Sequence, residues 1–83
     1  MGFTVYLLWS ERIQKYYTGH TECISRRITE HNRGKNRSTV KGMPWEITCL
    51  QEVSSLQEAI KLESKIKKRG AGRFLDDILN QQG

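Results

Sequence analysis

The chain has 83 residues, of which 36% are hydrophobic and 28% are charged, and its formal net charge is +5 at neutral pH. This length allows one small domain over residues 1–83 with a thin core, and the composition excludes a membrane protein and wholesale disorder. No apolar run approaches the length of a transmembrane helix, and the N-terminus lacks a signal-peptide pattern, so we expect a cytoplasmic protein without membrane contact.

Two strands are predicted first. Residues 3–9 (FTVYLLW) are rich in aromatic and branched side chains, which favours a strand. Alternate side chains define one strongly apolar face (Phe3, Val5, Leu7, Trp9) and one mixed face (Thr4, Tyr6, Leu8, Ser10). The short polar segment 10–14 indicates a hairpin connection to a returning strand at 15–18, which we expect to end at Gly19.

A helix and a third strand follow. Apolar spacing turns helical from Glu22 to about Asn32, with Thr21 as the expected N-cap residue. Residues 33–44 (RGKNRSTVKGMP) form a long polar and basic loop, and residues 45–53 (WEITCLQEV) form the third strand. The tryptophan at its start, Trp45, either packs in the core or stacks on an exposed base.

The last third of the chain is helical. Ser55 and Glu58 have capping-box spacing for a helix that runs to about Arg69 and stops at Gly70. Residues 73–79 indicate a short final helix before a polar tail at 80–83. The predicted order is β-β-α-β-α-α, an α+β domain with its core between residues 3 and about 79.

Two cysteines, Cys23 and Cys49, are too few and too isolated for a disulfide framework, and we expect each to be a small buried apolar residue. A zinc site built from these cysteines with His20 and His31 is the alternative. It lacks the paired C-x-x-C spacing that is typical of such sites.

Basic residues concentrate in two segments, from Arg26 to Lys41 and from Lys61 to Arg73. Each segment holds six of the fourteen lysines and arginines. Two such segments favour a polyanion, because phosphates release counterions when lysine and arginine approach. The alternative is a solvated helix face next to a polar loop.

Charged side chains also fall on predicted core-facing surfaces. Arg27 and His31 lie four residues apart on the apolar side of the first helix, and a guanidinium there needs an anionic partner. Glu63 lies within the apolar stripe of the second helix. It either pairs with Lys67 one turn away, or serves as a metal ligand or as the partner of Arg27.

Two short motifs resemble those of the GIY-YIG nuclease family, in particular its small single-domain members. Thr4-Val5-Tyr6 resembles the first motif and Tyr17-Thr18-Gly19 resembles the second. Arg27 stands ten residues after Tyr17, which is the family's spacing for its arginine. The resemblance implies a small three-stranded antiparallel sheet flanked by helices.

The resemblance continues through both helices. The run from Arg26 to Asn32 resembles the R-R-(x)3-H-N stretch of the small members, and Glu63 matches the family's metal-binding glutamate. The chain departs from the family pattern at four positions. Thr4 stands in place of glycine and Thr18 in place of isoleucine. His20 stands where several members have lysine, and Leu75 where some have asparagine.

The resemblance implies hydrolysis of a DNA phosphodiester, in repair or recombination, with one Mg²⁺ or Mn²⁺ held by Glu63. Tyr6 is the implied general base, and neighbouring cations such as His20 and the metal are expected to lower the pKa of its phenol. Tyr17 is implied to orient the water or bind the phosphate, Arg27 to hold the scissile phosphate, and His31 to position the nucleophile or Tyr6, or to exchange protons. The remaining implied DNA-binding residues are His20, Asn32, Arg33, Lys35, Arg37 and Lys67.

Two other functions remain open at this stage. The first is a nucleic-acid-binding module that keeps the fold without catalysis. The second is an adaptor domain whose basic surface binds an acidic protein. The chain offers no second domain to select a substrate, so a nuclease of this kind is expected to read DNA shape or to depend on a recruiting protein.

Overall fold

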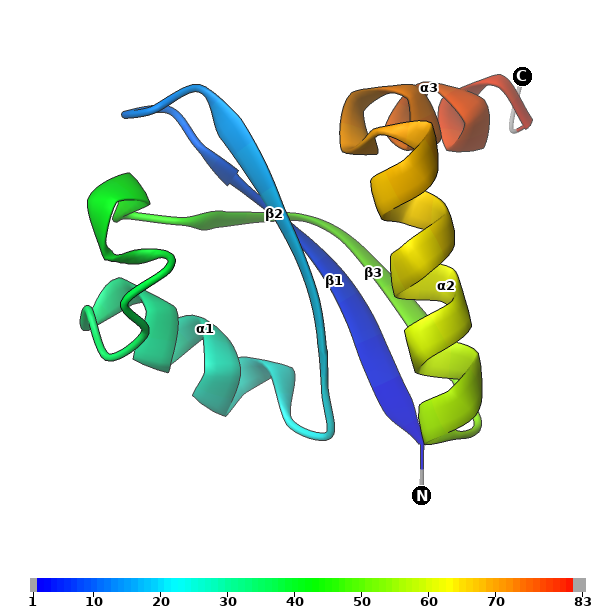
Figure 1. Ribbon diagram of the computed structural model, residues 1–83, viewed down its shortest axis with the longest axis horizontal. Helices are drawn as coiled ribbons and strands as arrows, with labels where there is room; N and C mark the ends of the chain where they lie inside the picture. Colours follow the sequence, from blue (N-terminus) through cyan, green and yellow to red (C-terminus); the bar gives the residue numbers. More distant parts are fainter. Residues whose placement is uncertain (1, 82–83) are drawn as a thin grey trace.

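The computed structural model describes residues 2–81 and contains one three-stranded antiparallel sheet and three α-helices (Figure 1). The elements in chain order are β1 (Phe3–Ser10), β2 (Lys15–Thr21), α1 (Ile24–Asn32), β3 (Glu46–Val53), α2 (Leu56–Arg69) and α3 (Ala71–Gln81). A short 3₁₀ helix, η1 (Val40–Gly42), lies in the loop between α1 and β3. The predicted α+β class and element order are therefore confirmed.

β1 is the middle strand, with β2 on one side and β3 on the other. The register pairs Tyr6 with Gly19 of β2 and with Leu50 of β3, and a bulge interrupts the β1–β3 pairing between Leu7 and Leu8. Both neighbours of β1 are edge strands, so β2 presents one free edge to solvent along the segment that carries Tyr17 and His20.

Helices cover both faces of the sheet, so side chains on both faces of β1 are buried. Val5 and Leu7 pack against Ala59 and Ile66 of α2 in one cluster. On the opposite face Tyr6, Leu8 and Trp45 form a second cluster against α1. Figure 1 shows α1 and α2 on opposite sides of the sheet, with α3 across the C-terminal end of α2. Trp45 is thus a packing residue.

β2 is longer than predicted. Gly19 does not end the strand, because Gly19, His20 and Thr21 continue the pairing with β1 as far as Thr4. Only glycine fits at position 19 of the sheet, because a Cβ there would lie 2.5 Å from the Tyr6 hydroxyl. The glycine marks a place where an aromatic ring crosses the backbone, not a turn.

The start of α1 also differs from the prediction. The N-cap residue is Cys23, which makes no side-chain capping bond, and the helix begins at Ile24. Thr21 is still part of β2 and its hydroxyl accepts a hydrogen bond from the Cys23 backbone N–H at 3.1 Å. The threonine therefore closes the turn between strand and helix, a local bond that competes with capping.

Cys23 is exposed and Cys49 is only partly buried, so the expectation of two buried cysteines is wrong for Cys23.

The C-terminal elements follow the capping signals, with a longer last helix. Ser55 accepts a hydrogen bond from the Glu58 N–H, and the Glu58 carboxylate accepts one from the Ser54 N–H. α3 begins at Ala71 instead of 73, because Gly70 adopts a φ of 93° and lets a new helix start at once. It also continues to Gln81, so the expected tail is helical as far as the description reaches, and residues 82–83 lie outside it. No helix within residues 2–81 is both long and apolar enough to cross a bilayer.

Candidate active site

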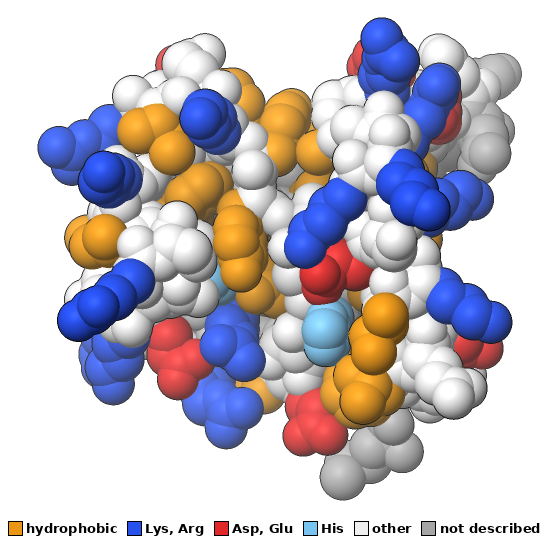
Figure 2. Space-filling model, viewed as in Figure 1, with side chains coloured by type: hydrophobic (Ala, Val, Ile, Leu, Met, Phe, Trp, Pro, Cys, Tyr) orange, Lys and Arg blue, Asp and Glu red, His pale blue; other side chains and the backbone are white. Residues whose placement is uncertain are grey.

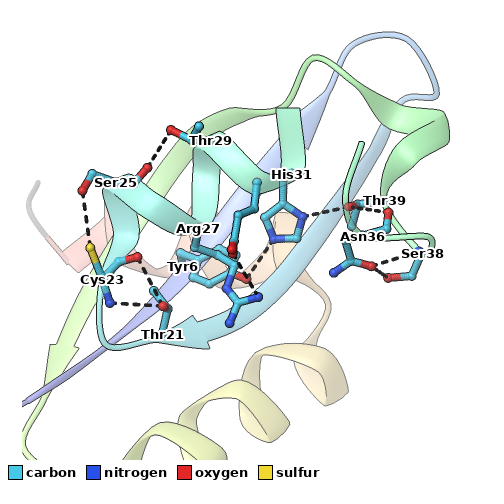
Figure 3. A network of polar contacts seen from close by, with 11 residues as sticks. Tyr6, Thr21, Cys23, Ser25, Arg27, Thr29, His31, Asn36, Ser38 and Thr39 are labelled. Atoms are coloured by element: carbon cyan, nitrogen blue, oxygen red, sulfur yellow. Dashed lines mark hydrogen bonds and ion pairs between the residues drawn. The ribbon is translucent and has the colours of Figure 1, made fainter. Parts of the chain in front are cut away.

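Three aromatic side chains from three elements meet on the α1 face of the sheet. Tyr6 of β1, Tyr17 of β2 and His31 of α1 have ring centroids between 5.2 and 6.4 Å apart. The Tyr6 hydroxyl and His31 Nε2 are 3.1 Å apart, and this hydrogen bond is buried (Figure 3). Residues that are 25 positions apart in the chain thus form one polar centre below α1.

Burial sets the protonation of this centre. Only 3% of Tyr6 and 1% of His31 is exposed. Burial lowers the pKa of His31, and the nearby Arg27 charge lowers it further against the opposing effect of Glu30. The ring is therefore neutral at neutral pH, and a neutral imidazole has one nitrogen free to accept a proton.

The phenol of Tyr6 does not have the lowered pKa that the sequence led us to expect. Burial, assisted by the neighbouring Tyr17, raises the pKa of Tyr6 to about 12. Arg27 opposes this rise, while the negative charges of Glu63 and Glu30 add to it. His20 is not among these neighbours. A phenol with so high a pKa is protonated at neutral pH and can act as a base only if it passes its own proton on.

Arg27 lies beside the Tyr6–His31 pair and is poorly matched by anions. Its nearest carboxylate oxygen belongs to Glu30, 3.6 Å from Nη1. Its Nε is buried and has no hydrogen-bond partner within the described residues. Figure 3 shows the guanidinium in front of the Tyr6 ring, whereas its neighbour Arg26 is exposed. A half-buried guanidinium with unused donors is suited to a phosphate.

Glu63 lies on α2 and has two partners. Its carboxylate accepts hydrogen bonds from Lys67 Nζ at 2.8 Å and from His20 Nδ1 at 2.7 Å. The expected pairing with Lys67 is thus present, and Arg27 is not in contact with this carboxylate. Burial alone would raise the pKa of Glu63, but the bonds from Lys67 and His20 outweigh it, and the pKa is lowered.

These residues divide between the two faces of the sheet. Tyr6, Tyr17, Arg27 and His31 lie on the α1 face, whereas His20 and Glu63 lie on the α2 face. The two groups adjoin at β2, where Tyr17 and His20 are three positions apart and Gly19 lies between them. Figure 2 shows a hollow between the two halves of this side of the molecule, with lysines and arginines on both margins.

The Glu63 carboxylate could serve as one ligand of a divalent ion. Within residues 2–81, no three His, Cys, Asp or Glu side chains form a cluster able to hold a metal. Each carboxylate oxygen of Glu63 keeps a second lone pair, and Lys67 is 58% exposed, so it is free to move aside. Mg²⁺ commonly binds through one carboxylate, with water and substrate phosphate as its other ligands.

The basic loop lies next to Arg27 and His31 on the α1 face of the sheet. Arg27, Glu30, His31, Lys35, Asn36 and Arg37 line a hollow of about 320 Å³. Arg33, Lys35 and Arg37 are exposed and carry no carboxylate partner among the described residues. A larger hollow of about 1120 Å³ lies between α2 and α3 and contains none of the aromatic centre. The smaller hollow is the one next to the reactive groups.

Asn32 is committed to the loop. Its side-chain amide donates to the Trp45 carbonyl at 3.1 Å and accepts from the Trp45 N–H at 2.6 Å. Both polar atoms of the amide are thus occupied by backbone. We assign Asn32 to fixing the loop that carries the basic residues.

Two residues of this site were not found from the sequence. Thr39 bonds to His31 Nδ1 at 2.8 Å, and Glu30 is the nearest acid to Arg27. The spacing of Glu30, one turn from Arg27, was a visible signal. Thr39 gave none, because nothing in a polar loop indicates which hydroxyl folds back onto a helix.

The sequence profile described as GIY-YIG catalytic domain matches residues 2–72 of this chain. The chain belongs to the GIY-YIG family. A UPF0213 protein of Syntrophus aciditrophicus is 41% identical over 64 residues, which cover 75% of this chain and 74% of that protein. A UPF0213 protein of Halobacterium salinarum is 35% identical over 54 residues, covering 64% of this chain and 70% of that one.

A solved structure supports the GIY-YIG fold as well. The solution NMR structure of the UPF0213 protein BH0048 from Bacillus halodurans aligns with a TM-score of 0.57 at 27% identity. The alignment covers 100% of this chain and 87% of that one. Membership places the chain among nuclease-type domains, which in general act on nucleic acid and use a divalent metal.

Proposed function

We propose that this GIY-YIG protein is a metal-dependent DNA endonuclease whose active site lies along the β2 edge. The observation that supports this most is the Tyr6–His31 hydrogen bond beside a guanidinium with unused donors. A proton-accepting pair next to a guanidinium that can bind phosphate is what phosphodiester hydrolysis requires. A role in DNA repair or recombination in the cytoplasm stays a prediction.

Proton transfer starts at Tyr6. The raised pKa of Tyr6 keeps its hydroxyl protonated, so the phenol takes a proton from the attacking water while its own proton moves to His31 Nε2. His31 becomes an imidazolium and later returns the proton to solvent. The hydroxide forms a bond to phosphorus, the bond from phosphorus to the 3′ oxygen breaks, and that oxygen takes up a proton from solvent to give a hydroxyl. Tyr6 is thus a relay and His31 is the final proton acceptor.

The other side chains bind and orient the phosphate. Arg27 donates to the phosphate oxygens and offsets the negative charge that grows in the transition state. Tyr17 lies at the rim, where its hydroxyl orients water or phosphate. A Mg²⁺ or Mn²⁺ ion held by Glu63 would supply further positive charge to offset that of the phosphate. His20 keeps the Glu63 carboxylate in place through its Nδ1–H.

The basic loop supports the DNA strand beside the site. Arg33, Lys35 and Arg37 are exposed on one side of Arg27, and Lys67 lies on the other side beside Glu63. These contacts go to phosphates and carry no base-specific information. We therefore infer low sequence specificity, with recognition of DNA shape or recruitment by a partner protein.

A second candidate is a DNA-binding module without catalysis. It is favoured by the state of Glu63, whose two oxygens already accept bonds from Lys67 and His20. If Lys67 does not release the carboxylate, the fold retains phosphate binding alone.

The test is a cleavage panel with Mg²⁺ and Mn²⁺ on single strands, duplexes, flaps and junctions. Wild type is expected to cut at least one substrate, and Glu63→Ala and Arg27→Ala are expected to abolish cutting with the fold intact by circular dichroism. Arg26→Ala and Glu52→Ala are matched controls, because both side chains are exposed, and they should cut normally. Salt-dependent binding without cleavage by any protein would support the second candidate. Absence of DNA binding at moderate salt would remove both.

A further inference from the structure

Thr39 ties the basic loop to the proton acceptor of the site. It is a buried residue just before η1, and its Oγ1 lies 2.8 Å from His31 Nδ1 (Figure 3). The same hydroxyl donates to the Asn36 carbonyl at 3.3 Å. The Thr39 carbonyl accepts a hydrogen bond from Trp45 Nε1 at 2.7 Å. Both polar ends of Thr39 are therefore fixed.

The positions of the protons along this chain of bonds can be worked out. The Asn36 carbonyl only accepts, so the single hydroxyl proton of Thr39 points to it, and Thr39 Oγ1 is left to accept from His31 Nδ1–H. His31 Nε2 then carries the lone pair and accepts the Tyr6 hydroxyl proton. With the other tautomer, the buried Tyr6 proton would have no acceptor within residues 2–81, which is costly.

We propose that Thr39 is a positioning residue of the active site: it holds His31 with the proton on Nδ1, so that the Nε2 lone pair faces the Tyr6 hydroxyl. This inference rests on the proposed function, in which His31 receives the proton of Tyr6. Thr39 itself touches neither substrate nor metal and acts only through His31.

The placement of Thr39 links this tautomer to the segment that would bind DNA. The loop is held at one end by Ser10, whose hydroxyl donates to the Gly42 carbonyl at 2.6 Å, and near its other end by Asn32. Lys35 and Arg37 belong to the same loop and line the same hollow as His31. A phosphate bound there contacts the segment that orients the imidazole.

Several charged or titratable groups face His31 and must be considered in any pH test. Arg27 and Glu30 lie on its own helix, Tyr6 on β1 and Tyr17 on β2. From the loop, Lys35 and Arg37 line the same hollow. Burial and the charge of Arg27 lower the pKa of His31 and disfavour an imidazolium, so the quantity that Thr39 controls is the tautomer of the neutral ring.

The direct test is ¹⁵N NMR of the imidazoles, in which two-bond ¹H–¹⁵N correlations distinguish the two tautomers. His31→Gln assigns the signals. Wild type and Thr39→Ser are expected to show His31 protonated on Nδ1, whereas Thr39→Val is expected to show the Nε2–H form or a mixture. The proposal is overturned if wild type shows the Nε2–H form, or if Thr39→Val leaves the tautomer unchanged. Failure of Thr39→Val to fold leaves the wild-type tautomer as the deciding result.

Cleavage kinetics provide the second readout. Thr39→Val is expected to lower kcat by about 10- to 100-fold with little change in KM, as is typical for loss of a partner behind a reactive group. Thr39→Ser should restore the rate. Ser38→Ala is the matched control, since the Ser38 hydroxyl bonds to Asn36 Oδ1 and does not contact His31. If wild type cuts no DNA, the proposed function fails while the NMR result still decides the role of Thr39.

Discussion

For Tyr6, the neighbouring sequence predicts the role of the side chain but not its pKa. Its motif indicated a catalytic phenol, but its pKa depends on burial and on Tyr17, Arg27 and two acids that come from other elements. The spacing of Arg27 and His31 on one helix could be predicted, since four residues make one turn. The bond from His31 to Thr39 could not, because it depends on how a loop folds back.

His31 should make the stability of the protein depend on pH. Its pKa is lowered in the folded state, so the unfolded chain takes up the proton first as the pH falls. The free energy of unfolding is therefore expected to be constant above the unfolded pKa of about 6.5 and to fall as the pH drops below it. Chemical denaturation between pH 5 and 8 measures this.

His31→Gln provides the comparison for that measurement. The variant lacks the imidazole and should show a much flatter profile over the same range. The lowered pKa of Glu63 acts only at more acidic pH, near the unfolded value of about 4.3, and does not interfere. An equally steep fall in the variant would mean that another group is responsible.

Gly19 tests the close approach of Tyr6 to β2. A Cβ at this position would lie 2.5 Å from the Tyr6 hydroxyl, so Gly19→Ala must displace the ring whose hydroxyl is bonded to His31. We expect a loss of stability of about 1–3 kcal/mol, as for other overpacked sites, together with loss of cleavage. Thermal denaturation and the cleavage assay measure the two effects. Normal stability and activity would show that the ring does not cross the strand here.

At the scale of the elements, the strongest sequence signals located the helices and strands, and the weaker ones misplaced their ends. The branched and aromatic runs gave β1 and β3, and the serine before Leu56 gave the start of α2. Gly19 was misread as the end of β2, since a glycine that breaks a strand and one that makes room for a ring look the same in sequence. The face of the sheet that each helix covers depends on how the connections between strands pass over the sheet. No local sequence pattern contains this information.

Gly72 offers a test of helix α3. It is the second residue of the helix and is exposed, and a Cβ there would meet only the Tyr16 ring at 3.9 Å. Because alanine is a better helix former than glycine, Gly72→Ala should stabilise the protein by roughly 0.5–1 kcal/mol. Urea denaturation with an unchanged m-value checks this. A destabilised variant would show that α3 does not extend to residue 71.

At the scale of the molecule, the basic charge is distributed on both margins of the β2 edge (Figure 2). If the loop binds phosphates, each lysine or arginine contact contributes about 0.9 to the slope of log affinity against log salt. Removing Lys35 and Arg37 together should reduce that slope by roughly 2. Fluorescence anisotropy titrations at several salt concentrations, without metal, measure it.

Arg12 and Lys15 serve as the control pair for this titration. Both side chains are exposed and carry the same charge; Arg12 lies on the turn between β1 and β2, and Lys15 is the first residue of β2, outside the basic loop. Their double alanine variant should keep the wild-type slope. Equal losses in both variants would indicate a diffuse electrostatic attraction instead of a defined interface.

The most direct test of the whole account is the cleavage rate of Tyr6→Phe compared with Tyr16→Phe. The first change removes the hydroxyl bonded to His31, and the second removes an exposed hydroxyl on the same hairpin. We predict that Tyr6→Phe lowers cleavage by about 100-fold or more, as expected for loss of a general base, while Tyr16→Phe cuts like wild type. Undiminished cleavage by a folded Tyr6→Phe protein would contradict the central claim that the buried Tyr6–His31 pair takes the proton from water.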